Sequence, residues 1–223
     1  MDLKASITVW LRVLSGSHEE IFAEELQKPY ARLATAVIWL VAAGLVAVLV
    51  WILVFMLLDP MGQSMEMMPQ FLGQMGFSAA ESAELMAQME NTAQASMFLM
   101  LCGLLVGIPG LALAWSGALW LAAKLLGGSG SYEEQTFLLA AFITPLVMVG
   151  VLLYLFPLLG PLLVMGLLVY GLYLTYFAVK VVHGLAAPKA FTAVAAPVIG
   201  FLLIACCAGM LWLAMLGAAL GAA

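Results

Sequence analysis

The sequence predicts an all-α integral membrane protein with five transmembrane helices, N-terminal interfacial helices and one outer amphipathic helix. Hydrophobic residues make up 66% of its 223 residues and charged residues 9%, whereas soluble domains carry roughly 25% charged residues. The charges gather between four long uncharged runs, 33–58, 91–123, 135–179 and 190–223. About 20 apolar residues cross a bilayer, and the third run holds two crossings because a Pro/Gly turn lies near its middle.

The distribution of charge predicts the orientation of the chain. The basic residues are Lys4, Arg12, Lys28, Arg32, Lys124, Lys180 and Lys189. With the N-terminus in the cytoplasm and five crossings, all of them are cytoplasmic, as Lys and Arg generally are in membrane proteins. The loop 59–96 is acidic and carries no basic residue. We therefore predict a cytoplasmic N-terminus, an external C-terminus and a location in the cell (plasma or inner) membrane.

Residues 1–32 are expected to form cytoplasmic interfacial helices. The segment 3–14 has one apolar helical face, formed by Leu3, Ile7, Trp10, Leu11 and Leu14. Lys4 and Arg12 lie off that face. Such a helix either lies flat on the cytoplasmic leaflet, with Trp10, Lys4 and Arg12 at the membrane interface, or packs against the bundle.

Residues 33–223 are expected to form the five-span membrane domain. Before it, Ser17 and Glu20 make a capping box that opens a second short helix. In the outer loop 59–96, Ser78 and Glu81 make another, which predicts an acidic amphipathic helix leading into the second span. The predicted spans are about 33–58, 97–121, 137–156, 162–179 and 191–216.

Proline and glycine residues indicate where the spans bend or approach one another. Pro109, Pro145 and Pro197 lie within the second, third and fifth spans and predict kinks. Gly103 and Gly107 permit a close helix approach, either inside the bundle or between two copies of the chain. The sequence is therefore compatible with a monomer and with a homo-oligomer.

Ionisable residues are missing at mid-membrane depth, where proton relays, ion sites and intramembrane proteases generally rely on them. We therefore expect no enzymatic activity and no ion-coupled transport, and we predict no catalytic residue, cofactor or nucleic-acid partner. Ser116 and Thr144 are interpreted as packing or helix-bonded hydroxyls. Cys102, Cys206 and Cys207 lie in apolar runs and are interpreted as small packing residues.

Methionines cluster in the outer loop, at Met61, Met65, Met67, Met68, Met75, Met86 and Met89. Thioethers can bind Cu(I), so the first four of these residues are an alternative metal site. A soft apolar surface covering the bundle is favoured instead, because methionine fills such surfaces well. No second set of methionines lines a span to carry an ion onward.

Two polar loops on the cytoplasmic side, 127–135 and 183–190, carry the candidate partner-binding residues. The first has the glycine content of a phosphate loop but lacks the Lys and Ser/Thr that a nucleotide site requires. We predict instead that side chains at these loops bind a cytoplasmic or membrane protein partner. The candidates are Tyr132, Glu133, Glu134, His183 and Lys189.

This layout resembles the Yip family, the Rab-interacting five-span membrane proteins, and specifically its prokaryotic branch. The resemblance covers nearly the whole chain. It rests on residues 9–14, residues 127–137, Thr144-Pro145, the short Pro/Gly turn, and His183-Gly184-Leu185 followed by Lys189-Ala190. The sequence departs from the family in having Ser15-Gly16 where many bacterial members have Ser-Pro, and Phe142 where tyrosine is common.

The resemblance implies a cytoplasmic N-terminus, an outside C-terminus and no enzymatic activity. Eukaryotic members assist vesicle traffic, and they bind Rab-type GTPases or shape membranes. The long N-terminal domain and the Asp-Leu-Tyr-Gly-Pro motif of those relatives are not found in this sequence. Its Ala/Gly-rich composition suggests a prokaryote, where Rab proteins are absent.

Two functions follow as hypotheses. The first is a non-enzymatic adaptor or membrane organiser that works through its cytoplasmic helix and loops, in contact with the lipid bilayer and a protein partner. The alternative is a small transporter or channel for a metal such as Cu(I) or for a lipid-like solute, because kinked helices often line cavities.

Overall fold

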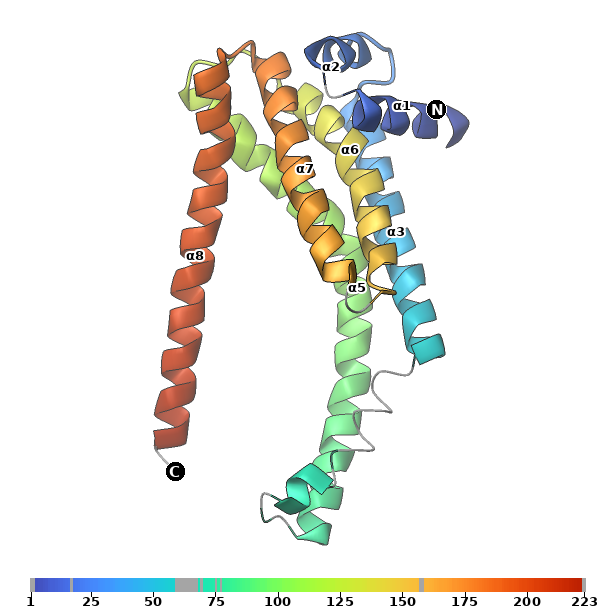
Figure 1. Ribbon diagram of the computed structural model, residues 1–223, viewed down its shortest axis with the longest axis vertical. Helices are drawn as coiled ribbons and strands as arrows, with labels where there is room; N and C mark the ends of the chain where they lie inside the picture. Colours follow the sequence, from blue (N-terminus) through green and yellow to red (C-terminus); the bar gives the residue numbers. More distant parts are fainter. Residues whose placement is uncertain are drawn as a thin grey trace. The chain divides into compact units, whose positions relative to one another are not determined.

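The computed structural model describes residues 3–16, 18–58, 68, 70–74, 76, 78–156 and 159–221. Its labelled helices (Figure 1) are α1 (Leu3–Ser15), α2 (Glu19–Leu26), α3 (Leu33–Leu58), α5 (Ala79–Leu125), α6 (Tyr132–Leu153), α7 (Leu159–His183) and α8 (Ala187–Gly221). The described residues contain no strand. The predicted all-α class is therefore confirmed.

Five of these helices contain a segment that is long and apolar enough to cross a membrane. The segments are Leu33–Met56, Met97–Leu125, Tyr132–Leu153, Leu159–His183 and Ala187–Trp212. The predicted five-span architecture is therefore confirmed. The capping box predicted for Ser17 and Glu20 includes Ser17, which lies outside the described residues. The predicted outer amphipathic helix and the second span are one continuous helix, α5, of 47 residues.

The three prolines predicted to kink the spans lie inside continuous helices. Pro109 is within α5, Pro145 within α6 and Pro197 within α8. A helix can continue through a proline when neighbouring turns and side chains satisfy the backbone group that the ring leaves unpaired. The prolines therefore do not divide these helices into separate elements.

The chain divides into two compact units. Unit 1 comprises Met1–Ala36, Leu113–Phe142 and Val169–Ala223. Its core is apolar and aromatic, and Val13, Phe22, Leu119, Phe137 and Leu174 are completely buried in it. Phe22 of α2 stacks against Phe177 of α7, with ring centroids 6.4 Å apart. This aromatic pair fixes the short helix α2 to the end of a predicted span.

Unit 2 comprises Val37–Ala112 and Ile143–Leu168. Helices α3 and α5 approach closely at Gly44 of α3, where a Cβ atom would lie 3.1 Å from the carbonyl oxygen of Leu105 in α5. Gly103 and Gly107, predicted as the contact positions, have no described neighbour within 4 Å of such an atom. The glycine that allows α3 and α5 to approach is therefore Gly44 of α3, and not Gly103 or Gly107 of α5.

The cysteines occupy outward-facing positions on their helices. Cys102, Cys206 and Cys207 are all exposed, whereas the sequence was interpreted as using them for packing. The reason is visible on α8, where every described side chain from Phe201 to Trp212 is exposed. This part of α8 has the apolar surface expected of a helix that faces lipid.

Candidate functional site: the polar end of unit 1

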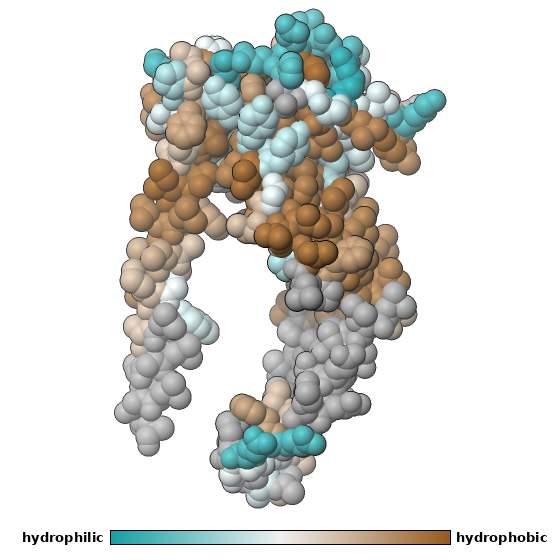
Figure 2. Space-filling model, in the orientation of Figure 1, coloured by the Kyte–Doolittle hydropathy of each residue, from teal (hydrophilic) through white to brown (hydrophobic). Residues whose placement is uncertain are grey.

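The polar end of unit 1 consists of α1, α2, loop 126–131 and loop 184–186 (Figure 1). All seven Lys and Arg residues of the chain belong to unit 1. Hydrophilic surface gathers over α1 and α2 (Figure 2). The two loops and the N-terminal helices that were predicted to share one side of the membrane thus belong to one compact unit.

Loop 126–131 packs directly onto the end of α7, and its glycines make this possible. A Cβ atom at Gly128 would lie 2.7 Å from the Cβ atom of His183. A Cβ atom at Gly130 would lie 2.3 Å from the carbonyl oxygen of Val182. The backbone N–H of Ser129, between the two glycines, donates to the carbonyl oxygen of His183 at 3.2 Å. The glycine content therefore serves close packing of this loop against the end of α7.

Each loop has a glycine in the left-handed region close to its start, and this glycine ends the preceding helix. Gly127 has φ +92° and Gly184 has φ +60°. In each case the following residue donates back to a carbonyl five positions earlier, Gly128 to Ala123 at 2.9 Å and Leu185 to Lys180 at 3.2 Å. This is the Schellman arrangement, in which the last carbonyls of a helix gain partners as the chain turns away.

Glu133 and Glu134, which follow loop 126–131 in the first turn of α6, both cap helices. Ser131 and Glu134 form a capping box at the start of α6: Ser131 N donates to Glu134 Oε2 at 3.0 Å, and Glu134 N donates to Ser131 Oγ at 3.2 Å. Glu133 Oε1 accepts from the backbone N–H of Leu33 at 2.9 Å, at the first residue of α3. Two helices of unit 1 are thus started by adjacent carboxylates.

A chain of buried polar side chains joins the ends of α5, α6 and α7. His183 Nε2 lies 2.7 Å from Gln135 Oε1, and Gln135 Nε2 donates to the carbonyl oxygen of Ser116 at 2.6 Å. The Ser116 hydroxyl lies 2.7 Å from the Thr136 hydroxyl, which donates to the carbonyl oxygen of Tyr132 at 2.7 Å. None of Ser116, Gln135, Thr136 and His183 is more than 2% exposed. Such groups are stable inside a protein only when they are hydrogen-bonded.

The network assigns the tautomer of His183. Because Gln135 Nε2 donates to the Ser116 carbonyl, Gln135 Oε1 is an acceptor, so His183 Nε2 carries a proton and donates to it. The buried Nδ1 atom has no hydrogen-bond partner among the described residues. Neutral His183 with a proton on Nε2 satisfies this arrangement, because an unprotonated Nδ1 needs no acceptor.

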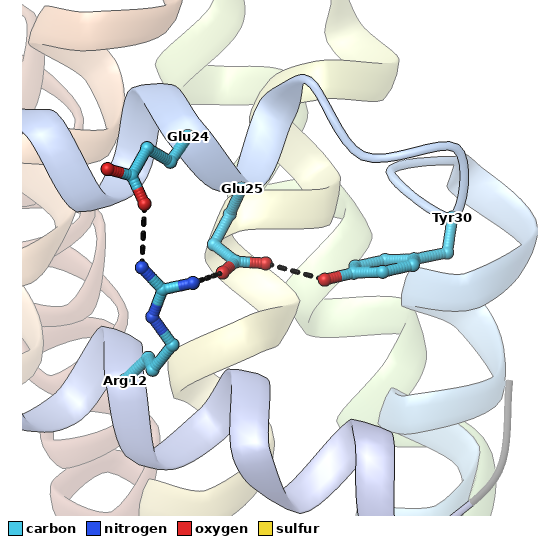
Figure 3. Close-up of polar contacts among 4 residues, drawn as sticks. All are labelled: Arg12, Glu24, Glu25 and Tyr30. Carbon is cyan, nitrogen blue, oxygen red and sulfur yellow. Dashed lines mark hydrogen bonds and ion pairs between the residues drawn. The ribbon is translucent and has the colours of Figure 1, made fainter.

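A second polar cluster holds α1 to α2 (Figure 3). Arg12 Nη1 donates to Glu25 Oε1 at 3.0 Å and Arg12 Nη2 to Glu24 Oε2 at 2.6 Å. The Tyr30 hydroxyl donates to the other oxygen of Glu25 at 2.9 Å. Burial, and then the hydrogen bond to Glu25, raises the pKa of Tyr30 to about 12. Tyr30 therefore remains a donor over the whole physiological pH range, and the 1% exposed carboxylate of Glu25 keeps two donors.

Substitution of Arg12 by leucine is expected to release α1 from α2. A buried carboxylate that loses its cationic partner is strongly disfavoured, and Glu25 would retain only Tyr30. We expect amide exchange in α1 to accelerate roughly tenfold or more, measured by hydrogen–deuterium exchange on the full chain in detergent. Arg32→Leu is the control, because Arg32 is exposed and has no side-chain ion pair among the described residues. Equal exchange in α1 for both variants would contradict the assigned role of Arg12.

An open groove lies beside these clusters, between α2 and the end of α7, with a volume of about 390 Å³. Its lining residues are Glu19, Glu20, Ala23, Lys180, Val181, Gly184 and Leu185. Lys180 forms an ion pair with Glu19 across it. Glu20, on the same lining, is exposed. The groove therefore presents charged side chains of both signs over an apolar floor.

The structure places the five predicted partner-binding residues in different environments. Tyr132 is half-buried, and its hydroxyl donates to the carbonyl oxygen of Leu113 at 3.0 Å. Glu133 and Glu134 cap helices, and His183 is buried. Lys189 is exposed near the start of α8. Partner binding by these residues stays a prediction, with Lys189 as the member whose side chain is most open to direct contact.

The other candidate residues of the sequence are placed as follows. Trp10, expected at the membrane interface, is 9% exposed and packs within unit 1. Arg12 pairs with α2, and Lys4 is exposed. Met61, Met65 and Met67 lie outside the described residues, and Met68 is half-buried. Among the described residues, no group of three or more His, Cys, Asp or Glu side chains is placed to hold a metal ion.

The sequence interpretation did not single out Gln135, Ser116, Thr136, Glu25 or Tyr30 as members of polar clusters. Only Gln135 carried a usable signal, because a long amide side chain entering an apolar span requires a buried partner. Glu25 belongs to an acidic helix whose other carboxylates are exposed. Which of these glutamates is buried depends on where α1 places Arg12, and this contact is not local in sequence.

Five helices long and apolar enough to cross a membrane, with a polar end in which a glycine-rich loop packs onto the end of α7, define a multi-pass membrane protein of the Yip type. The chain matches the Yip1 domain over residues 17–210 and belongs to that family. The match begins two residues before α2 and ends within the fifth candidate span. No curated protein and no solved structure matched the chain.

Proposed function

We propose that this Yip1-domain protein is a non-enzymatic adaptor or membrane organiser that binds a protein partner at the polar end of unit 1. On this proposal the polar end faces the cytoplasm of a prokaryotic cell, and the protein resides in the plasma or inner membrane. The observation that supports the proposal is the groove between α2 and α7, which combines exposed charges with apolar floor residues. Interfaces of this mixed character are typical of non-obligate protein–protein contacts.

The buried polar chain supports this proposal by making the surface rigid. His183 lies within hydrogen-bond distance of Gln135, which in turn bonds to Ser116. Glu134 and Glu133 cap α6 and α3. These residues would therefore shape the surface, whereas Glu20 and Lys189 would contact the partner. Preorganised surfaces bind with a smaller entropic cost.

The same contacts favour adaptor function over transport. Ser116, Gln135 and Thr136 hydrogen-bond to each other and to helix carbonyls, which is the arrangement of a structural network and not of a solute pathway.

Charge reversal at Glu20, which lines the groove, and at Lys189, near the start of α8, tests this proposal without disturbing its scaffold. The variant Glu20→Lys/Lys189→Glu changes two exposed side chains and is expected to fold normally. We expect a stoichiometric partner to co-purify with the wild-type protein from native membranes in mild detergent, and to be lost with the variant, as read by mass spectrometry. Glu84→Lys, on an exposed position of α5 in unit 2, is the matched control and should retain the partner. A partner retained by both variants, or none with the wild type, contradicts the proposal.

A further inference from the structure

Helix α1 has three distinct faces. Ser6, Val9, Trp10 and Val13 are buried against unit 1. Leu3, Ile7 and Leu11 are 71%, 42% and 61% exposed. Lys4 and Thr8, each one position after a member of that apolar row, are exposed as well. Residues four apart advance only about 40° around a helix, and the next residue about 100°. The apolar and polar rows are therefore separate stripes, and both are distinct from the buried face.

We propose that α1 is a membrane-surface helix whose lipid contact is the exposed stripe Leu3, Ile7 and Leu11. The sequence alone indicated a wider apolar face for this contact, with Trp10, Lys4 and Arg12 at the membrane interface; its members are Leu3, Ile7, Trp10, Leu11 and Leu14. The structure assigns Trp10 and Arg12 elsewhere, because Trp10 faces the core of unit 1 and Arg12 is paired with Glu24 and Glu25. Three large apolar side chains at four-residue spacing remain for the acyl boundary of the bilayer, as in other interfacial helices.

The polar row shows which side of α1 faces water. Arg12 continues the row of Lys4 and Thr8 by another four residues, and its guanidinium reaches α2 (Figure 3). Helix α2 carries Glu19, Glu20 and Glu24 as exposed carboxylates, which require water. The apolar stripe is turned about 100° from this row. One side of α1 thus faces water and one packs against the protein. The third side is left to contact the acyl chains of the bilayer.

The contacts with α7 place α1 deeper than α2. Helix α2 meets α7 at Phe177 and Lys180. Helix α1 meets it at Tyr170, whose hydroxyl donates to the carbonyl oxygen of Leu14. Seven to ten residues of helix correspond to about 10–15 Å along the axis of α7. The C-terminal end of α1 is therefore held by a residue near the middle of the candidate span Leu159–His183, two to three turns further along α7 than the residues that hold α2.

The span itself also has exposed apolar side chains close to Tyr170 in sequence. Val169 and Tyr173, on either side of Tyr170 in α7, are 65% and 47% exposed. An exposed Val169 in a membrane-spanning helix faces acyl chains. The family match begins at residue 17, after the end of α1, so this assignment rests on the contacts of this chain alone.

Lipid-embedded and aqueous quenchers test which medium each stripe of α1 contacts. In the full chain with Cys102, Cys206 and Cys207 replaced by alanine, a fluorophore is attached at Leu11→Cys or, as the matched control, at Thr8→Cys. The protein is reconstituted in phosphatidylcholine liposomes. We expect several-fold stronger quenching by doxyl-labelled lipid than by iodide for the label at 11, and the reverse for the label at 8.

The other outcomes overturn the proposal. Iodide quenching at position 11 equal to that at position 8 would mean that the stripe faces water. Protection of position 11 from both quenchers would mean that a protein, including a second copy of the chain, covers it. Lys4 is the only cation beside the stripe with a free side chain among the described residues of α1. The result should therefore change little when phosphatidylglycerol is added, and a requirement for anionic lipid would contradict apolar insertion.

A second measurement avoids labels. The variant Ile7→Asn/Leu11→Asn is expected to accelerate amide exchange in α1 several-fold in lipid nanodiscs, because the stripe would lose its affinity for the acyl boundary. The contacts of Val9, Val13 and Arg12 are retained in this variant. The variant Thr8→Ala/Ser15→Ala changes two exposed polar positions on the same helix and should leave exchange unchanged. No difference between the two variants would argue against lipid contact.

Discussion

Alanine at position 130 is expected to lower the midpoint temperature of thermal unfolding more than any other single methyl group added to unit 1. The new Cβ atom would lie 2.3 Å from the carbonyl oxygen of Val182 and 2.4 Å from its Cγ1 atom. The first of these is backbone near the end of α7 and cannot rotate away. Overpacking of a tight contact costs about 1–3 kcal/mol, and a backbone contact places Gly130→Ala at the upper end of this range.

The same substitution elsewhere provides the control. Gly117→Ala adds a methyl group within α5, where the nearest side-chain atom is 4.0 Å away. Gly200→Ala adds one on α8, where no described atom lies within 4 Å. Both should be neutral or slightly stabilising, because alanine is the better helix former by roughly 1 kcal/mol. If Gly130→Ala unfolded at the same temperature as these two variants in detergent, the interlocking of loop 126–131 with α7 would be contradicted.

Replacement of Gln135 by leucine is expected to have the second large effect. Leucine has a similar size but leaves His183 Nε2 without its acceptor in a site where His183 is 2% exposed. A buried donor left unsatisfied costs about 1–3 kcal/mol. The Ser116 hydroxyl keeps its contact with Thr136, so the loss is concentrated on the histidine. Thermal unfolding in detergent, followed by circular dichroism, measures this change.

A double-mutant cycle distinguishes a network from simple loss of volume. We expect Gln135→Leu and His183→Leu each to be destabilising, and the double variant to be less destabilised than the sum of the two. Removing both members of a buried hydrogen bond leaves no orphaned polar atom between them, and contacting residues deviate from additivity for this reason. Strict additivity would mean that the hydrogen bond between Gln135 and His183 does not contribute to stability.

The class of protein and its broad layout could be predicted from the sequence. The four uncharged runs, together with the Pro/Gly turn inside the third, identify five spans, because only a long apolar helix satisfies its backbone inside a bilayer. The span ends were less predictable. The fourth predicted span stopped at residue 179, whereas α7 continues to His183, since a helix ends where its carbonyls find other partners and not where apolar residues stop. Gly184 supplies that ending.

The two polar loops could also be recognised, but their chemistry could not. The same glycines and glutamates are compatible with a partner site, a phosphate site or tight packing, because composition does not reveal what lies opposite a residue. Gly128 and Gly130 face His183 and Val182, about fifty residues later in the chain. Only the tertiary structure supplies that neighbour.

By itself, the sequence determined that this chain is a five-span membrane protein and that residues 3–14 form an amphipathic helix, and it predicted that the basic residues lie on one side. These properties depend on composition and on local periodicity. The tertiary structure decided which face of α1 is buried and which glutamate of α2 is buried. It also decided which hydrogen-bond partners Gln135 and His183 meet. Each of these depends on contacts between distant segments, and the cost of burying a polar group is set by the partner that folding brings to it.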